Sequence, residues 1–451
     1  MIRLGLGEIA EIVGGVEHGD AGTVVSGDPT LDSRDVRPGA LFVALAGEHV
    51  DGHDYATEAV AAGAAAVLAS RVVEAPCVVV DDVTVALATL ATEVLRRLGT
   101  TVVAVTGSQG KTSVKDLLAQ VLEPTGPTVA PRGSFNNDLG VPLTVLRIDE
   151  DTRFLVVEMG ARGIGHIAAL CRIAPPDVSL VLNVGHAHVG EFGSPNVTAQ
   201  AKGEIVDALS ADGTAVLNAD DHRVAAMADR VAGRVLTFGR AGDVTLGDVE
   251  LDAAGEPHFS LTYRGETVDV HVPQIGAHHA ANAAAAAAAG IALGLDLPTI
   301  SERLGRAGAQ SPMRMARHVR SDGLVVIDDA YNANPESMAA ALQTLPSLGG
   351  HRTIAVLGEM LELGPDSADQ HRAVGRLAAD LGIDLVLAVG PGAAGIAEGA
   401  GERGRAVADV SEAVSALSAW LAPDDVVLVK ASRGARLERV TEALLEGTPT
   451  R

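Results

Sequence analysis

The stretch that decides the fold runs Val102-Val-Ala-Val-Thr-Gly-Ser-Gln-Gly-Lys-Thr-Ser-Val-Lys-Asp-Leu-Leu118. Its beginning, Val102 to Val105, is apolar on both faces, which is typical of a buried parallel strand. The turn Gly107-Ser-Gln-Gly110 follows, and apolar residues at helical spacing from Val114 to Val121 then predict a helix. Such a turn points backbone N–H groups at one place, and the helix N-terminus adds partial positive charge there. We therefore expect the turn to bind an anion.

The two residues after the turn point to the phosphates of a nucleotide. Lys111 is placed to reach the terminal phosphates, and the Thr112 hydroxyl is placed to ligate Mg²⁺. The motif is not a strict Walker A sequence, because Val105 stands where that motif has its first glycine. The loop is the shorter Thr-Gly-Ser-x-Gly-Lys-Thr type. A strand–turn–helix with an incidental lysine is the alternative interpretation, but the coincidence of all these features favours nucleotide binding.

Composition limits the class of protein. The 451 residues are 47% hydrophobic but only 2% aromatic, so we expect a core of Ala, Val and Leu. The formal charge of −24 argues against a nucleic-acid partner. Cys77 and Cys171 lie far apart and predict neither a disulfide nor a metal site. No stretch predicts a signal peptide or a membrane span. We expect a cytoplasmic, monomeric enzyme.

Strands and helices alternate along the chain, which predicts an α/β protein. We divide it into a small unit at 1–97, a central unit at 98–310 and a third at 311–451. The first unit has predicted strands at 26–31, 39–45 and 77–80, and helices at 55–63 and 85–98. Strands of the later units are predicted at 154–158, 178–183, 214–218, 324–327, 353–357, 385–388 and 426–429, with an irregular β region at 243–272.

Polar residues end several of these strands, where ligands collect in open α/β sheets. Glu158, Asn183 and Asn218 each end a strand of the central unit, and Glu158 is a candidate ligand for Mg²⁺, which prefers oxygen. A solvated acid is the alternative for Glu158. Lys202 enters a predicted helix, and such a lysine is usually on the surface. In the third unit, Lys430 is placed to gather a carboxylate or a phosphate.

Taken in order, these pieces resemble the Mur ligase family over essentially the whole chain. The resemblance rests on motifs spread from the first unit to the last. They are Asp32-Ser-Arg34, Pro38-Gly-Ala-Leu-Phe-Val-Ala-Leu45, Thr106-Gly-Ser-Gln-Gly-Lys-Thr112, Asn136-Asn-Asp-Leu-Gly-Val-Pro142, Glu158-Met-Gly160, Ala201-Lys-Gly-Glu204, Asp329-Ala-Tyr-Asn-Ala-Asn-Pro335, Gly358-Glu-Met-Leu-Glu-Leu-Gly364 and Lys430-Ala-Ser432. One departure is His279, which stands where many members have asparagine.

The resemblance implies three domains: an N-terminal α/β domain that holds a UDP-sugar, a central P-loop-type ATPase domain with a parallel sheet, and a Rossmann-like C-terminal domain. It implies ATP and Mg²⁺, and a carbamylated lysine at Lys202. Catalytic roles are implied for Lys111, Lys202 and His188. The implied metal ligands are Thr112, Glu158, His188 and Lys202. The implied nucleotide contacts are Gly107, Ser108, Gln109, Gly110, Lys111, Thr112, Ser113, Asn282, Arg314, Asp329, Tyr331, Asn332 and Asn334. The implied substrate contacts are Ser33, Arg34, Asn136, Asn137, Lys430 and Ser432.

The implied reaction is ATP-driven amide formation through an acyl phosphate. Two runs, Tyr331-Asn-Ala-Asn-Pro335 and Gly358-Glu-Met-Leu-Glu-Leu-Gly364, resemble the family member that adds D-alanyl-D-alanine to UDP-N-acetylmuramoyl-tripeptide in peptidoglycan precursor synthesis. Three alternatives remain open from the sequence: a P-loop kinase or NTPase, a non-catalytic nucleotide-binding protein, and a Mur-like ligase of another peptide pathway.

Overall fold

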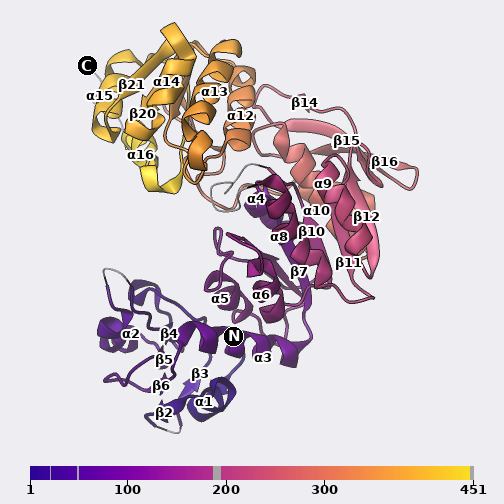
Figure 1. The fold of residues 1–451 in the computed structure, drawn as a ribbon, viewed down its shortest axis with the longest axis vertical. Coiled ribbons are helices and arrows are strands. Elements are labelled where there is room, and N and C mark those ends of the chain that lie inside the picture. Colours follow the sequence, from indigo (N-terminus) through magenta and orange to yellow (C-terminus); the bar gives the residue numbers. More distant parts are fainter. Residues whose placement is uncertain (21, 48–49, 186–193, 447–451) are drawn as a thin grey trace.

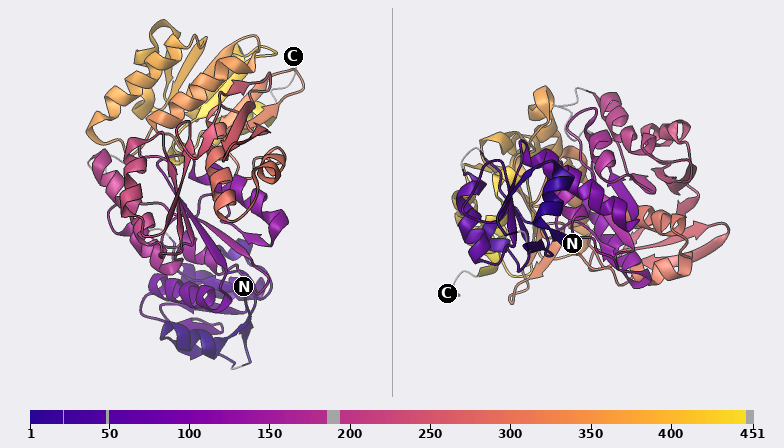
Figure 2. Two further views of the ribbon diagram at one scale, coloured as in Figure 1. Left: turned by 90° about the vertical axis from the view of Figure 1, so that its right-hand side faces the viewer. Right: turned by 90° about the horizontal axis from the view of Figure 1, so that it is seen from below.

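A computed structural model describes residues 1–20, 22–47, 50–185 and 194–446. Within these residues the strands form sheets of two, four, ten and six strands. Figure 1 shows three bodies in chain order: an N-terminal one at one end of the long axis, a central one, and a C-terminal one at the other end. The left view of Figure 2 shows the same order. The sheets lie within 1–97, 98–310 and 311–451, which we keep as the proposed limits of the domains.

The N-terminal body is built on a small mixed sheet. Its four strands run in the order β2-β6-β5-β4, and a separate pair joins β1 to β3. Their bounds are β1 Leu4–Gly5, β2 Val16–His18, β3 Val24–Val25, β4 Leu41–Val43, β5 Ala66–Ala69 and β6 Cys77–Val79, with helices α1 Leu6–Val13, α2 Ala56–Ala61 and α3 Val83–Leu98.

The strand predicted at 26–31 is wrong. In this segment only Thr30 forms a bridge, with Phe42. Pro29 has no N–H to donate to a ladder, which explains why the pairing does not continue. The strands predicted at 39–45 and 77–80 and the helix predicted at 55–63 are confirmed with shorter bounds, and the helix predicted at 85–98 begins two residues earlier, at Val83.

The long helix α3 leads from this body into the central one. The Asp82 carboxylate caps its N-terminus by accepting hydrogen bonds from the N–H groups of Thr84 and Val85, at 2.8 and 3.0 Å. Gly99 ends it in the left-handed conformation, with φ 62°. The next residues begin the strand that carries the deciding stretch.

The central body contains the ten-stranded sheet, in the order β14-β15-β13-β12-β11-β10-β7-β9-β8 with β16 paired to β15. In the order of the sheet, the strands β13, β12, β11, β10, β7, β9 and β8 are parallel to one another. The strands β14, β15 and β16 add an antiparallel edge. Their bounds are β7 Thr101–Thr106, β8 Thr128–Val129, β9 Phe154–Glu158, β10 Val178–Val181, β11 Thr214–Asn218, β12 Arg234–Gly239, β13 Val244–Leu246, β14 Glu250–Leu251, β15 Pro257–Tyr263 and β16 Glu266–His271.

Helices cover both faces of this sheet (Figure 2). One face packs on α4 (Lys111–Leu122), α10 (His278–Ala292) and α11 (Leu297–Leu304). The other packs on α6 (His166–Ile173) and α8 (Pro195–Asp207), with α5 (Gly140–Val145) and α9 (His222–Ala225) beside them. Every residue of α10 from Ala283 to Ala289 is fully buried. Because alanine side chains are small, this helix lies close against α4 and the sheet.

The C-terminal body has a six-stranded sheet in the order β17-β18-β22-β19-β20-β21. Only β17 is antiparallel to its neighbour. The strands are β17 Ala316–Val319, β18 Val325–Asp329, β19 Thr353–Leu357, β20 Leu385–Val389, β21 Gly404–Val407 and β22 Val426–Lys430. The helices are α12 Pro335–Thr344, α13 Ser367–Asp380, α14 Ala394–Ala400, α15 Val410–Trp420 and α16 Glu438–Glu446.

Cys77 and Cys171 are both free and buried. Among the described residues, no helix is both long and apolar enough to cross a membrane.

Candidate active site

A cavity of about 920 Å³ lies where the central and C-terminal bodies meet. Two sets of parallel strands end at it. The ends of β7, β9 and β10 supply the phosphate loop, Glu158 and Asn183, and the ends of β18 and β22 supply Asp329 and Lys430. The site therefore has a central wall and a C-terminal wall, both built at the carboxyl ends of strands, as expected for open α/β sheets.

The phosphate loop is held in shape from the neighbouring strand. The side-chain oxygen of Asn183, just after β10, accepts hydrogen bonds from the N–H groups of Ser108 and Gln109, at 2.9 and 3.0 Å. Gly110 has φ +81°, and a Cβ there would lie 2.7 Å from the Asn282 side-chain oxygen, so only glycine fits. No described residue accepts a hydrogen bond from the backbone amides of Lys111, Thr112 or Ser113, which begin α4. These amides form a donor set for an anion.

Glu158 lies behind the loop with its carboxylate fixed on both oxygens. One oxygen accepts a hydrogen bond from the Asn136 amide at 2.7 Å, and the other accepts one from the Thr112 hydroxyl at 2.9 Å. The side chain is 1% exposed. A buried carboxylate beside a hydroxyl is an oxygen donor set that suits Mg²⁺. The residues present therefore fit the metal that the sequence predicts.

The lysines of the chain are Lys111, Lys115, Lys202 and Lys430. Lys111, Lys202 and Lys430 line the cavity. For Lys202 this differs from the sequence pattern, which favoured a position on the surface. In fact Lys202 is 3% exposed, because α8 packs its face against the sheet and α6. Burial, with the charge of Lys111, holds the pKa of Lys202 well below its usual value. No described carboxylate lies within ion-pair distance of Lys202.

Lys111 turns back toward its own loop. Its ammonium donates a hydrogen bond to the Gly107 carbonyl at 2.8 Å. Burial lowers its pKa, and Arg314 adds to this effect while Glu158 opposes it. No described carboxylate lies within ion-pair distance of this ammonium, so it is placed to meet an incoming phosphate.

The C-terminal wall differs because its charges are already paired. Asp329 and Lys430 are register partners in neighbouring parallel strands. The Lys430 ammonium donates to the Asp329 carboxylate at 2.6 Å and to the Asn332 carbonyl at 2.9 Å. Burial lowers the pKa of Lys430, and Asp329 opposes that shift.

Arg314 and Tyr331 join the two walls. The Arg314 guanidinium lies 4.3 Å from the centre of the Tyr331 ring and also donates to the Thr112 hydroxyl at 3.3 Å. The Tyr331 hydroxyl forms a hydrogen bond with the Ser134 hydroxyl of the central body. Met313 and Met315, on either side of Arg314, have left-handed backbone angles of φ 55° and 52°.

Most residues predicted for the site are brought together. Those that line the cavity are Ser108, Gln109, Gly110, Lys111, Thr112, Ser113, Asn136, Asn137, Glu158, Lys202, Asn282, Arg314, Asp329, Tyr331, Asn332, Asn334 and Lys430. Gly107 contributes its carbonyl to Lys111. Ser33, Arg34 and Ser432 are not among the lining residues. His188 lies outside the described residues, and so does His186.

Three of the residues predicted for the site have local structural partners. The Asn334 side chain caps α12 by accepting a hydrogen bond from the Ser337 N–H at 2.8 Å, in a capping box. The Ser432 hydroxyl accepts a hydrogen bond from the Leu361 N–H at 3.0 Å. Arg34 is paired with Asp32 at 2.6 Å on the surface of the N-terminal body.

The sequence interpretation left out some residues of the cavity. The sequence identifies Asn183 only as a polar residue at the end of a strand. Its hydrogen bonds to the phosphate loop depend on the pairing of β10 with β7. His278 and His279 also line the cavity. Burial lowers the pKa of His278 to about 4 and that of His279 well below its usual value, so both rings are neutral. The Nδ1 atom of each is buried with no partner among the described residues.

The sequence matches three Mur ligase family models. They are the Mur ligase family catalytic domain over 30–100, the Mur ligase middle domain over 105–290 and the Mur ligase glutamate ligase domain over 313–433. The chain therefore belongs to the Mur ligase family, and the three-domain α/β architecture predicted from the sequence is confirmed.

Individual relatives match over nearly the full length. A UDP-N-acetylmuramoyl-tripeptide–D-alanyl-D-alanine ligase of Mycobacterium tuberculosis is 45% identical, over 99% of this chain and 98% of its own. A crystal structure of MurF from Acinetobacter baumannii has a TM-score of 0.89 with 31% identity, covering 99% of this chain and 100% of that one. The MurF ligase of Thermotoga maritima in complex with ADP has a TM-score of 0.79 and 32% identity, covering 93% and 97%.

Proposed function

We propose that this chain is an ATP-dependent ligase that joins D-alanyl-D-alanine to UDP-N-acetylmuramoyl-tripeptide, giving the pentapeptide, ADP and phosphate. The observation that carries the proposal is the single cavity in which a phosphate loop, a buried acid and buried amines from two domains meet. The relatives that match this chain over 98–100% of their length bear the name of that ligase. The proposal replaces the wider set of nucleotide enzymes that the loop alone allowed.

ATP binds in this proposal with its phosphates on the loop from Gly107 to Ser113. The unengaged amides at the start of α4 and the ammonium of Lys111 meet the β- and γ-phosphates. Asn282 lies against Gly110, and Arg314 stacks on Tyr331 above Thr112, so both are close enough to contact the nucleotide. Asp329, Asn332 and Asn334 are also assigned to the nucleotide, because they line the cavity. Asn334 is assigned by its place in the cavity, since its side chain already caps α12.

Thr112 and Glu158 are the proposed ligands of Mg²⁺, together with a modified Lys202 and with His188. When bound, this ion supplies positive charge that offsets the negative charge of the transferring phosphoryl group. The support from this chain is the fixed, buried carboxylate of Glu158 beside the Thr112 hydroxyl.

Lys202 is proposed to carry a carbamate. The nitrogen of a neutral lysine attacks the carbon of CO₂, the N–C bond forms, and one proton leaves to solvent. This step needs an uncharged amine, and burial beside Lys111 favours that form by lowering the pKa of Lys202. The product is an anionic oxygen donor in place of a buried cation. A carbamate therefore relieves the repulsion between Lys202 and Lys111.

The chemistry then follows from charge placement. A carboxylate oxygen of the tripeptide attacks the γ-phosphorus, the bond to the β,γ-bridging oxygen breaks, and ADP leaves. Lys111 and the loop amides stabilise the charge on the transferring group. The amine of D-alanyl-D-alanine attacks the resulting acyl phosphate, and the tetrahedral intermediate expels phosphate and loses a proton. Because acyl phosphates hydrolyse, closure of the C-terminal domain over the site protects the intermediate.

The remaining predicted residues are assigned to the peptide and sugar substrates. Asn136 and Asn137 line the cavity, and so does Leu31 of the N-terminal body. Ser33 and Arg34 lie just beyond Leu31 and are proposed to hold the UDP-sugar. Lys430 and Ser432 are proposed to position the peptide from the C-terminal wall.

The test is ADP release by the purified chain with ATP, Mg²⁺ and UDP-N-acetylmuramoyl-tripeptide, with and without D-alanyl-D-alanine, and mass detection of the product. We expect ADP and UDP-N-acetylmuramoyl-pentapeptide in equal amounts. L-alanyl-L-alanine is the matched control dipeptide and should give no amide. ADP without an amide product, or phosphate transferred to a hydroxyl, would replace the ligase with an NTPase or a kinase.

Carbamylation has its own readout. Protein incubated with ¹³C-labelled bicarbonate should show a carbamate carbon in its ¹³C NMR spectrum. Lys202→Arg should lose that signal, because a guanidinium does not form the adduct at neutral pH. A signal that persists in Lys202→Arg would assign the carbamate to another amine.

A further inference from the structure

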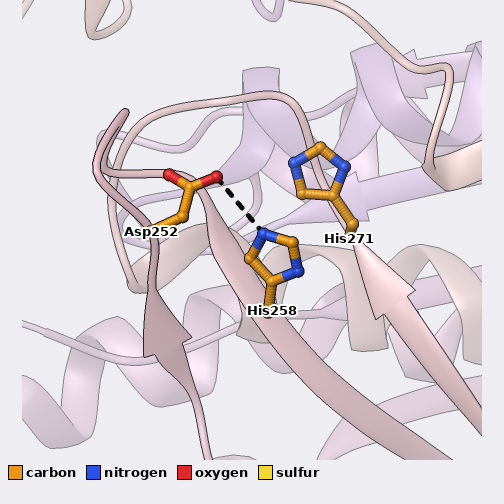
Figure 3. Close-up of side chains that lie close together, drawn as sticks. All are labelled: Asp252, His258 and His271. Carbon is orange, nitrogen blue, oxygen red and sulfur yellow. Dashed lines mark hydrogen bonds and ion pairs between the residues drawn. The ribbon is translucent and has the colours of Figure 1, made fainter.

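A cluster of two histidines and two carboxylates lies at the antiparallel edge of the central sheet, on the β14–β15 turn and the β15–β16 hairpin. His258 and His271 face each other as register partners in β15 and β16. Their rings are stacked, with centres 4.5 Å apart and planes 17° apart. Figure 3 shows the Asp252 carboxylate beside the His258 ring, with the His271 ring next to it. None of these residues lines the cavity described above.

Each ring already meets a carboxylate through its Nε2 atom. This atom of His258 lies 3.3 Å from an oxygen of Asp252, and that of His271 lies 2.7 Å from an oxygen of Glu256. The second oxygen of Asp252 accepts hydrogen bonds from the N–H groups of Ala254 and Glu256, at 2.8 and 3.0 Å. The turn therefore fixes the Asp252 carboxylate and leaves one oxygen facing the rings.

We propose that Asp252, His258 and His271, with Glu256 as a fourth ligand, bind a divalent first-row transition metal ion, for which Zn²⁺ is the best fit. One donor atom from each of the first three residues lies within 4.8 Å of the other two. Two imidazole nitrogens and two carboxylate oxygens form a donor set typical of four-coordinate zinc. Imidazole is a poor ligand for Mg²⁺ and Ca²⁺, which prefer oxygen, so this site is selective against the metal of the active site.

Binding requires only rotation of the side chains. Zinc–nitrogen bonds are about 2.0–2.1 Å long, so the two Nε2 atoms must turn toward a common point between the rings and the carboxylates. His258 and Asp252 are partly exposed, at 51% and 38% of the side chain, which leaves them room to turn. The ion replaces the protons that now lie between the rings and the carboxylates.

The turn that carries Asp252 and Glu256 also contacts the C-terminal body. The Gly255 carbonyl accepts a hydrogen bond from the Gly276 N–H at 2.8 Å, just before α10. Gly255 also lies against Ile275 and against Leu348, which follows α12. A bound ion would join this turn to the ends of β15 and β16, and so stabilise the edge of the sheet where the two bodies meet (Figure 1).

The test is titration of the full chain with Zn²⁺ by calorimetry, in excess Mg²⁺ and ADP so that the active site is occupied. Co²⁺ serves as a second probe, because four-coordinate cobalt with nitrogen and oxygen ligands absorbs in the visible range. We expect one Zn²⁺ per chain in this edge site. Loss of a residue that only hydrogen-bonds to a metal ligand weakens metal binding about 10–100-fold. The double variant His258→Ala/His271→Ala removes two ligands themselves, so it should bind Zn²⁺ about 100-fold more weakly or worse.

Two further variants make the result decisive. His222→Ala removes an exposed histidine on α9 and should bind Zn²⁺ like the parent. Asp252→Asn keeps the oxygen that holds the turn but loses one ligand, and should weaken binding at least about 10-fold. Turnover should be unchanged in all of them. Absence of Zn²⁺ binding by the parent, or equal binding by the parent and Asp252→Asn and the double variant, would overturn the proposal.

Discussion

The two walls of the cavity are built alike but balance their charges differently. Both place polar residues at the carboxyl ends of neighbouring parallel strands. On the C-terminal wall, Lys430 and Asp329 neutralise each other. On the central wall, Lys111 and Lys202 have no described carboxylate in ion-pair distance, and the described hydrogen bonds to Glu158 come from the neutral side chains of Thr112 and Asn136. This difference indicates that the central wall is arranged to bind charged ligands. On the C-terminal wall the charges of Lys430 and Asp329 already balance each other.

The sharpest test of this comparison is Lys111→Met. If the central wall awaits a phosphate, removal of its ammonium should lower turnover by about a thousand-fold or more, as for other cations that stabilise a transferring phosphoryl group. The fold should remain intact, because among the described residues this ammonium donates only to the Gly107 carbonyl. Steady-state ADP release and circular dichroism would measure both. Arg306→Ala, which removes an exposed cation that pairs with Glu302, is the control and should behave as the parent.

The walls should also respond oppositely in stability. Lys430→Met leaves Asp329 buried without its cation, and breaking a buried ion pair from one side costs about 3–5 kcal/mol. Lys202→Met removes a buried amine that has no anionic partner among the described residues, so this variant should be as stable as the protein without carbamate, or more stable. Chemical denaturation in CO₂-free buffer would compare them. Equal destabilisation by both variants would show that the walls do not differ in this way.

The sequence alone predicts only part of the structure of the two walls. The strand–turn–helix around Lys111 is local, so its period and glycines predicted β7, the loop and α4 correctly. Strands 154–158, 214–218 and 353–357 were predicted with the bounds that the structure has, because continuous apolar runs ending in a polar residue or a turn mark buried parallel strands. The prediction of a strand at 26–31 was wrong because Pro29 has no N–H to donate, so the residues around it do not form a ladder despite their β propensity.

Long-range packing decided what the sequence missed. Lys202 is an ordinary surface residue by pattern, and only the docking of α8 against β10 and α6 buries it. Asn183 grips the phosphate loop because β10 pairs with β7, across 75 residues of sequence. The edge cluster has the same origin, since His258 and His271 meet only when β15 pairs with β16. Asn334 shows the converse: a local cap explains its side chain without any ligand.

A smaller effect should appear in the pH dependence of the unliganded, CO₂-free protein. Burial lowers the pKa of Lys202 from 10.5, so between its folded and unfolded pKa values the unfolded chain binds more protons. Stability should therefore rise with pH in this window, by at most about 1.4 kcal/mol per pH unit for one group. Thermal midpoints from pH 7 to about 10 would show the rise, and Lys202→Met should flatten it. An identical pH dependence in Lys202→Met would assign the effect to another group.

The smallest expected effect is at the junction between the walls. Tyr331→Phe keeps the ring on which the Arg314 guanidinium stacks but removes the hydroxyl that bonds to Ser134. Loss of one such hydrogen bond costs about 0.5–1.5 kcal/mol, so Tyr331→Phe should raise the KM for ATP only a few-fold with little change in kcat. Tyr331→Leu loses the ring as well, and a cation–π contact adds about 0.5–2 kcal/mol. If both variants behaved alike, the bond from the hydroxyl to Ser134, rather than the stacked ring, would hold Arg314 over Thr112.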